Sequence, residues 1–269
     1  MSLLKNKVAV ITGGAQGLGQ ALTERLASEG CDVVVADMKE EALKATAESV
    51  AAKTGRKVIP VVCNVSVEAD VEKLFATAVQ NFVRVDVVVA NAAILIAEPI
   101  FSADAEKWRA VMNVNLFGNF LTFKHACKIM KDQKSGSIIQ INSKSGKKGS
   151  AANSAYAASK FGGIGLVQSV ALEMAKFNVR CNAVCPGNLL ESPLWTDEKN
   201  GLFVQYLKAG KVPGAQSIAD VKKAYEGQVP LGRGCRYEDI GNIVSFLASD
   251  LSNYMTGQGI NVTGGQEMR

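Results

Sequence analysis

The stretch KVAVITGGAQGLG (residues 7–19) carries the strongest structural signal in this chain. Its first half is a short apolar, β-branched run, which predicts a buried strand. Gly13, Gly17 and Gly19 follow, and glycines here let the backbone turn tightly and approach a pyrophosphate group. The next residues have helical spacing, and a helix N-terminus offers free N–H donors to an anion. This order of strand, turn and helix predicts a dinucleotide-binding unit.

The same alternation of strand and helix patterns continues along the chain. Apolar runs that suit buried parallel strands occur at residues 32–37, 57–62, 85–90, 137–142 and 179–185, and a seventh strand is expected within 256–265. We therefore predict an α/β fold, a Rossmann-type doubly wound parallel sheet of about seven strands, with residues 1–269 as a single domain. Residues 188–230 interrupt the alternation, and we expect this insertion to be a substrate loop.

Composition narrows the class of protein. The chain has 269 residues, 48% of them hydrophobic and 20% charged, with a net charge of +5 and no long apolar run. We expect a cytoplasmic protein that spans no membrane. The positive charge is not gathered among aromatic residues, so no nucleic-acid partner is expected. The six cysteines and one histidine lack the spacing of a metal site, so we expect no metal and reduced thiols.

Asp37 indicates which dinucleotide binds. It ends the second predicted strand, where a carboxylate can accept hydrogen bonds from the adenosine ribose and repels a 2′-phosphate. No Arg or Lys lies between Thr12 and Gly19 to offset that repulsion, so we expect NAD rather than NADP. Asn64 follows the third strand, and its amide is placed to contact the adenine ring.

A second set of residues suggests proton chemistry. Tyr156 and Lys160 are four residues apart in a predicted helix, which puts them on one face. A neighbouring ammonium favours the phenolate form of a tyrosine, whose ordinary pKa is about 10. Ser143, at the end of a predicted strand, can donate a hydrogen bond to a substrate oxygen.

Together these motifs resemble the classical short-chain dehydrogenase/reductase family. The resemblance covers the whole chain and rests on TGGAQGLG, the spacing of Ser143, Tyr156 and Lys160, Asn115 in VNLFG, and Pro186–Gly187. It implies hydride transfer between a nicotinamide and a secondary alcohol or ketone. It also implies that Tyr156 is the general acid/base and that Ser143 orients the reacting oxygen. Lys160 would bind the nicotinamide ribose and lower the tyrosine pKa, and Asn115 would help to hold a proton-relay water. A homotetramer is expected.

One motif departs from the family pattern. Where relatives commonly have NNAG after the fourth strand, this chain has Ala90, Asn91, Ala92 and Ala93, so the asparagine is kept and two positions differ. The expected cofactor-binding residues are Gly13, Gln16, Gly17, Leu18, Gly19, Asp37, Asn64, Val65, Asn91, Tyr156, Lys160, Pro186 and Gly187.

The segment SKSGKKG (residues 143–149) indicates the kind of substrate. Lys144, Lys147 and Lys148 follow the serine at the carboxyl end of a strand, where α/β sheets bind ligands. Such a cationic rim favours an anionic substrate. Adjacent residues of an extended chain point in opposite directions, so Lys147 or Lys148 is expected to contact a phosphate. Arg233 and Arg236 are expected to add positive charge near the mouth.

A narrower resemblance lies in residues 138–269. The stretches INSKSGK, PGNLLESP and NVTGGQ are similar to a branch of the family that acts on a phosphorylated polyol. This implies NAD-dependent oxidation of D-sorbitol 6-phosphate at C2 to fructose 6-phosphate. The expected substrate-binding residues are Ser143, Lys144, Lys147, Lys148, Tyr156 and Asn188.

Three alternatives stay open at this point. An unphosphorylated sugar or polyol fits if the lysines are solvated. A 3-oxoacyl-carrier-protein substrate fits a basic rim, although Asp37 disfavours NADP. A non-catalytic, NAD-binding regulatory protein would be free to lose Tyr156 or Lys160, and both are present.

Overall fold

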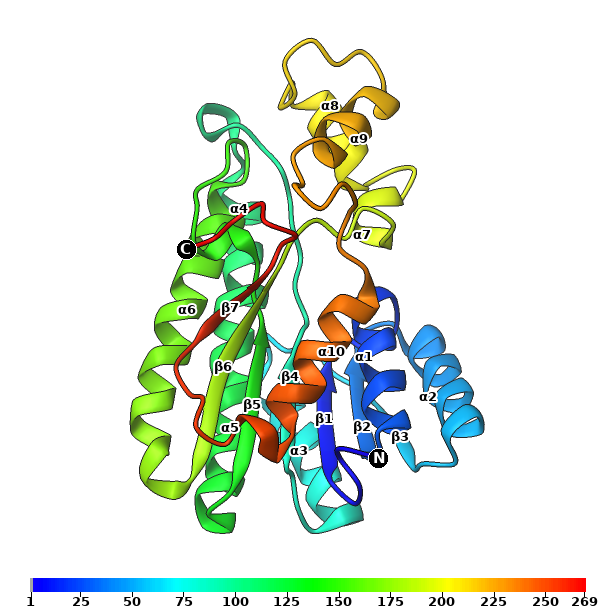
Figure 1. Cartoon of the computed structure of the whole chain (residues 1–269), viewed down its shortest axis with the longest axis vertical. Helices are drawn as coiled ribbons and strands as arrows, with labels where there is room; N and C mark the ends of the chain where they lie inside the picture. The colour runs from blue at the N-terminus through cyan, green and yellow to red at the C-terminus, as the bar shows by residue number, and fades with distance from the viewer. Residues whose placement is uncertain (1) are drawn as a thin grey trace.

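The computed structural model describes residues 2–269 and contains one sheet of seven parallel strands. The strands lie in the order β3-β2-β1-β4-β5-β6-β7. This arrangement confirms the predicted fold class, a Rossmann-type doubly wound sheet (Figure 1). The strands are β1 (Val8–Thr12), β2 (Asp32–Asp37), β3 (Val58–Val62), β4 (Val87–Ala90), β5 (Gly136–Ile141), β6 (Val179–Pro186) and β7 (Gly259–Val262).

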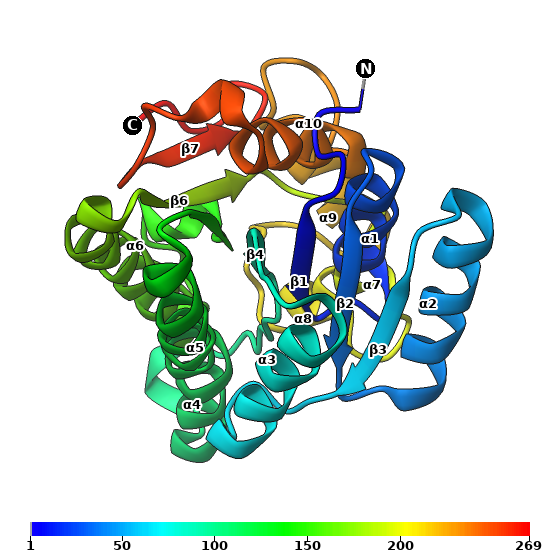
Figure 2. The same cartoon turned by 90° about the horizontal axis from the view of Figure 1, so that it is seen from below.

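Helices cover both faces of the sheet, as the view from below shows (Figure 2). Those against one face are α1 (Gly17–Ser28), α2 (Glu40–Thr54) and α10 (Tyr237–Ala248). Those against the other are α3 (Glu68–Phe82), α4 (Ala105–Met112), α5 (Gly118–Gln133) and α6 (Ser154–Met174). Among residues 2–269, no helix combines the length and the apolar character needed to cross a membrane.

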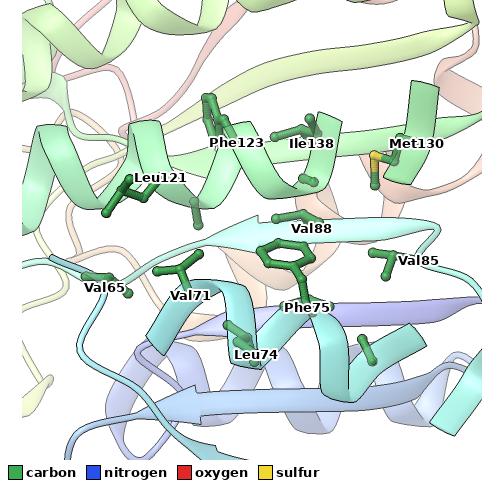
Figure 3. Close-up of a cluster of buried hydrophobic side chains, with 14 of the residues drawn as sticks. Val65, Val71, Leu74, Phe75, Val85, Val88, Leu121, Phe123, Met130 and Ile138 are labelled. Atoms are coloured by element: carbon green, nitrogen blue, oxygen red, sulfur yellow. The ribbon is translucent and has the colours of Figure 1, made fainter. Parts of the chain in front are cut away.

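Each face of the sheet has its own apolar core. Figure 3 shows part of one core, where Phe75 of α3 and Leu121 of α5 lie on either side of Val88 of β4. The core on the opposite face includes Leu22 of α1 and Ile240 of α10. Because both faces are buried, the strands must be apolar at successive positions, which explains the continuous runs in the sequence.

The carboxyl ends of the strands carry an additional layer. Residues 188–230 form α7 (Pro193–Thr196), α8 (Leu202–Lys208) and α9 (Ile218–Glu226), which lie beyond the strand ends (Figure 1, top). A third apolar cluster joins them, in which the rings of Phe203, Tyr206 and Tyr225 each pack against Trp195. The insertion is therefore a packed helical cap with its own core.

Two glycines of α6 differ in their surroundings. A Cβ at Gly163 would lie 2.8 Å from the side-chain amide of Gln140 and 2.9 Å from Nδ2 of Asn142, so only glycine lets α6 approach β5 this closely. A Cβ at Gly165 would meet no atom within 4 Å.

We predict opposite effects of alanine at these two positions. Gly163→Ala should lower the free energy of unfolding by about 1–3 kcal/mol, because the methyl group overpacks the junction of α6 and β5. Gly165→Ala should raise it by up to about 1 kcal/mol, because glycine is a poor helix former. Denaturant unfolding of both variants tests this. A Gly163→Ala variant as stable as the unsubstituted chain would contradict the described packing.

Candidate active site

A cavity of about 1320 Å³ opens at the carboxyl ends of the strands, beneath the helical cap. It exceeds the roughly 300–1,000 Å³ of a typical small-ligand pocket and has room for more than one molecule. Most of the predicted site residues line it: Gly13, Gln16, Gly17, Leu18, Gly19, Asp37, Asn64, Val65, Asn91, Ser143, Lys144, Lys148, Tyr156, Lys160, Pro186, Gly187 and Asn188. Asn115 and Lys147 are not among the lining residues.

The glycine-rich turn leaves room for a ligand at the start of α1. Gly13 has a φ of +69°, and a Cβ there would lie 2.8 Å from Cα of Ala92. A Cβ at Gly19 would overlap the carbonyl oxygen of Gly13, at 1.9 Å. Helix α1 starts at Gly17, and the side chain of Gln16 makes no capping hydrogen bond. The first N–H groups of α1 are thus not satisfied by a side-chain cap and suit an anionic group.

Asp37 places a carboxylate at the end of β2, inside the cavity. Its oxygens accept hydrogen bonds from the backbone N–H groups of Ala15 (3.1 Å) and Lys39 (3.0 Å). The ammonium of Lys39, which also lines the cavity, donates to Oε1 of Gln16 at 2.9 Å. Asn64 uses its side-chain oxygen within its own turn, where it accepts from the N–H of Ser66 at 3.0 Å.

Asn91 stabilises the cofactor turn. Its side-chain amide donates to the carbonyl oxygens of Thr12 (3.1 Å) and Gly13 (3.0 Å), which joins the end of β4 to the end of β1. Ala92 and Ala93 also line the cavity, and of these Ala93 departs from the common motif. The departure from the common motif therefore keeps the amide that fixes the turn.

Ser143, Tyr156 and Lys160 come together at one wall of the cavity. Ser143 lies between β5 and a short 3₁₀ helix, η3 (Lys144–Gly146), and hydrogen-bonds to Tyr156 of α6. Lys160, one turn further along α6, is 2% exposed, and its ammonium donates to the carbonyl oxygen of Ile141 at 2.8 Å. The Lys160 Nζ lies 5.5 Å from the centre of the Tyr156 ring.

Burial governs the pKa values of this pair. Desolvation raises the pKa of Tyr156 to about 12, against the lowering effect of its hydrogen bond with Ser143. Desolvation also lowers the pKa of Lys160 to about 8. The expectation that Lys160 lowers the pKa of Tyr156 stays a prediction, and burial is the largest influence on that pKa in this structure.

Asn115 has a different position from the other predicted residues. It is fully buried in a π-helical turn, η2 (Asn113–Phe117), between α4 and α5. Its side chain accepts from the N–H of Ile94 (2.8 Å) and donates to the Ile94 carbonyl (2.9 Å) and to Oγ of Ser159 (3.1 Å). Asn115 therefore ties the segment after β4, which lines the cavity, to α6.

The three lysines that follow Ser143 do not all line the cavity. Lys144 and Lys148 line the cavity, whereas the ammonium of Lys147 donates to the carbonyl oxygen of Gly259 in β7, at 2.6 Å. The geometry therefore does not support the prediction that Lys147 binds substrate. The extended chain ends at Ser143 and η3 begins at Lys144, so alternation no longer determines side-chain direction. Burial, followed by the charge of Lys148, lowers the pKa of Lys144 to about 8.

Several lining residues were not predicted. Lys211 enters the cavity from the loop after α8. Ser192 also lines it, and its buried hydroxyl has no hydrogen-bond partner within the described residues. Both lie in the insertion; Ser192 falls within the PGNLLESP stretch, whereas no motif of the sequence marks Lys211. Arg233 instead pairs with Asp239 at 2.6 Å, and neither it nor Arg236 is among the lining residues, so the positive charge of the cavity lining comes from lysines.

Residues 7–201 match the short chain dehydrogenase family. The chain belongs to this family and is an oxidoreductase of the Rossmann fold. It is 40% identical over 266 residues to sorbitol-6-phosphate 2-dehydrogenase of Escherichia coli (strain K12), covering 98% of this chain and 99% of the relative. It is also 36% identical to a 3-oxoacyl-[acyl-carrier-protein] reductase of Thermotoga maritima, over 97% of this chain and 98% of the relative.

Solved structures show the same similarity. The crystal structure of sorbitol-6-phosphate 2-dehydrogenase from Erwinia amylovora superimposes with a TM-score of 0.90 at 40% identity, covering 97% of this chain and all of that chain. The structure of NAD⁺-bound xylitol dehydrogenase also gives a TM-score of 0.90, at 30% identity, covering 97% and 99% of the two chains.

Proposed function

We propose that this protein oxidises D-sorbitol 6-phosphate at C2 to fructose 6-phosphate, with NAD as hydride acceptor. One observation carries the choice of substrate: two ammonium groups, on Lys144 and Lys148, line the same cavity as Ser143 and Tyr156. Within residues 2–269, no carboxylate oxygen lies within 4.0 Å of either ammonium. Two relatives named for this substrate at 40% identity support the proposal.

The proposed proton transfer uses Tyr156. Bound NAD supplies the hydride acceptor. Tyr156 accepts the proton of the C2 hydroxyl, and Ser143 donates a hydrogen bond that holds the same oxygen. Lys160, with a pKa of about 8, is protonated at pH 7 and favours the phenolate. Its ammonium has three N–H donors, of which one is used on Ile141, so the others are available to a ribose hydroxyl.

Asn115 acts indirectly in this scheme. By keeping the segment after β4 fixed to α6, it maintains the cavity wall opposite Tyr156. The water that the family resemblance places beside it would relay the proton from Lys160 towards solvent. We propose Asn115 as a positioning residue for that relay.

The residues present fit a dinucleotide. The uncapped start of α1 and the space left by the glycines suit a pyrophosphate, and the unpartnered hydroxyl of Ser192 suits a polar group of the nicotinamide. Asp37 lines the same cavity, and a carboxylate there can accept hydrogen bonds from ribose hydroxyls, which supports NAD over NADP.

An acyl carrier is less well supported as the substrate. A carrier protein would dock through cations on the outer surface, whereas Lys144 is half-buried inside the cavity. A small phosphorylated molecule can reach that position. The geometry therefore favours a compact anion over an acidic protein.

We propose a homotetramer, following the family resemblance. Phe117, Phe120 and Phe161 are each between 43% and 47% exposed on the outer surface of η2, α5 and α6. Apolar side chains gathered on one face favour contact with a second copy. The proposed cytoplasmic location rests on the sequence.

Asp37 should control cofactor choice. The unsubstituted protein should have a higher kcat/KM with NAD than with NADP, and Asp37→Ser should reduce this ratio at least tenfold. The reason is that the substitution removes the charge that repels a 2′-phosphate and leaves Lys39 nearby. Steady-state kinetics with both cofactors tests this, and an unchanged ratio would refute the assignment.

Tyr156 should be needed for turnover but not for cofactor binding. Tyr156→Phe should lower kcat by about 10²–10⁴-fold, because the variant has no group to accept the proton. NAD binding, followed by calorimetry, should persist. Tyr254→Phe, at a fully exposed tyrosine, serves as the matched control and should keep full activity. Comparable activity in the two variants would exclude the proposed proton transfer.

The phosphate should dominate substrate choice. With NAD, kcat/KM for sorbitol 6-phosphate should exceed that for sorbitol at least a hundredfold. Lys144→Met should reduce this ratio about tenfold or more by removing a charge-assisted contact. Lys147→Met should leave the ratio unchanged, since that ammonium binds Gly259. Equal values of kcat/KM for the two substrates in the unsubstituted protein would overturn the proposed substrate.

The same ratio should depend on pH. Lys144 is charged below its pKa of about 8 and neutral above it, so its attraction for phosphate declines as pH rises through 8. Lys148 and Glu267 also face Lys144. The charge of Lys148 lowers the pKa of Lys144, and the charge of Glu267 raises it. Dividing kcat/KM for sorbitol 6-phosphate by that for sorbitol cancels the shared titration of Tyr156. A ratio that stays constant between pH 7 and pH 9.5 would argue against Lys144.

A further inference from the structure

Lys211 brings a further ammonium into the cavity, from the insertion at residues 188–230. It follows α8, where Gly210, with a φ of +58°, ends the helix. Its Nζ donates to Oγ of Ser150 at 2.9 Å. When the Asn153 amide is oriented so that both its oxygen and its nitrogen have hydrogen-bond partners, Lys211 also donates to the Asn153 side-chain oxygen at 2.8 Å.

The helical cap holds Lys211 in place. Its ammonium lies 3.9 Å from the centre of the Tyr206 ring, a distance typical of a strong cation–π contact. The Tyr206 hydroxyl bonds to the same Asn153 oxygen, at 2.9 Å. The Tyr206 ring stacks on Tyr225 and meets the edge of Trp195. Lys211 is therefore fixed by the aromatic core of the insertion on one side and by the loop before α6 on the other.

The charge of Lys211 is not neutralised by the protein. Its partners Ser150, Asn153 and Tyr206 are all uncharged, and within the described residues no carboxylate oxygen lies within 4.0 Å of its Nζ. Burial and the nearby positive charge of Lys144 lower the pKa of Lys211 to about 8. Two half-buried cations that repel each other across a cavity form a site whose charge a dianion would balance.

We propose that Lys211 and Lys144 bind the substrate phosphate between them, so that the insertion at 188–230 recognises the phosphate. This inference rests on the proposed function, because it assumes a phosphomonoester substrate. A phosphate in this position bridges the serine loop, which carries Ser143, and the helical cap, which closes over the cavity. Phosphate binding then favours the arrangement in which the cap covers the reacting carbon, and an unphosphorylated polyol lacks this contribution.

The first test compares Lys211→Met with Lys208→Met, a control at an exposed lysine in the last turn of the preceding helix, α8. For sorbitol 6-phosphate, Lys211→Met should lower kcat/KM by on the order of ten- to a hundredfold, mainly through KM. For sorbitol, kcat/KM should change less than threefold. Lys211→Arg should restore at least part of the loss, because it keeps the charge. Lys208→Met should change neither value.

The two lysines should also be coupled. If Lys144 and Lys211 contact the same phosphate, Lys144→Met combined with Lys211→Met should cost less than the product of the two single losses. Inorganic phosphate should raise the Tm of the unsubstituted protein and of Lys211→Arg, and raise that of Lys211→Met less. This readout needs no turnover, and Lys211→Gln, which keeps a hydrogen-bond donor to Ser150, replaces Lys211→Met if that variant does not fold.

The outcomes separate this inference from the proposed function. If the unsubstituted protein prefers sorbitol 6-phosphate but Lys211→Met lowers kcat/KM equally for both substrates, or for neither, Lys211 is structural and the inference is wrong. The inference would also be wrong if the losses in kcat/KM caused by the Lys144 and Lys211 substitutions simply multiplied in the double variant. If the unsubstituted protein shows no preference for the phosphorylated substrate, the proposed function itself fails.

Discussion

The parallel pairing of β1 with β4 is the constraint on which the rest of the site depends. The chain reverses its direction of progress across the sheet at this pair, so the connections after β1 and β4 leave in opposite directions. The resulting crevice is where open α/β sheets bind ligands. Asn91 holds the two strand ends together, and the glycine turn, Ser143 and the start of the cap all reach this edge because their strands are parallel.

Uncompensated positive charge then determines what the cavity can bind. Lys160, Lys144 and Lys211 each have a pKa lowered to about 8, chiefly by burial. A buried ammonium without a counter-ion is unfavourable in an empty site and favourable when an anion or an electron-rich oxygen arrives. Lys160 lies beside Tyr156, where the proposed chemistry occurs, and the other two line the part of the cavity to which we assign the phosphate. The same physical effect therefore supports both catalysis and selection in the proposed function.

The sequence predicted the parts of the molecule that local patterns control. Apolar runs marked the buried strands, the glycines marked the cofactor turn, and helical spacing brought Tyr156 and Lys160 to one face. The sequence did not predict the sites where tertiary packing decides which way a side chain points. Lys147 was assigned to the substrate because the turn into η3 is not visible in the sequence, and Lys211 was missed because its position depends on an aromatic core assembled from α7, α8 and α9. The sequence also could not show how strongly burial raises the pKa of Tyr156, because desolvation is a property of the folded cavity.

The central claim is that one cavity holds the phosphate on Lys144 and Lys211 while Ser143 and Tyr156 hold the reacting oxygen. The most direct measurement is a crystal structure of the complex with NAD and sorbitol 6-phosphate, obtained with the Tyr156→Phe variant to prevent turnover. Our account predicts phosphate oxygens within hydrogen-bonding distance of both ammonium groups and the C2 hydroxyl oxygen beside Ser143 Oγ. A phosphate that points into solvent, or away from these lysines while C2 is correctly placed, would contradict it.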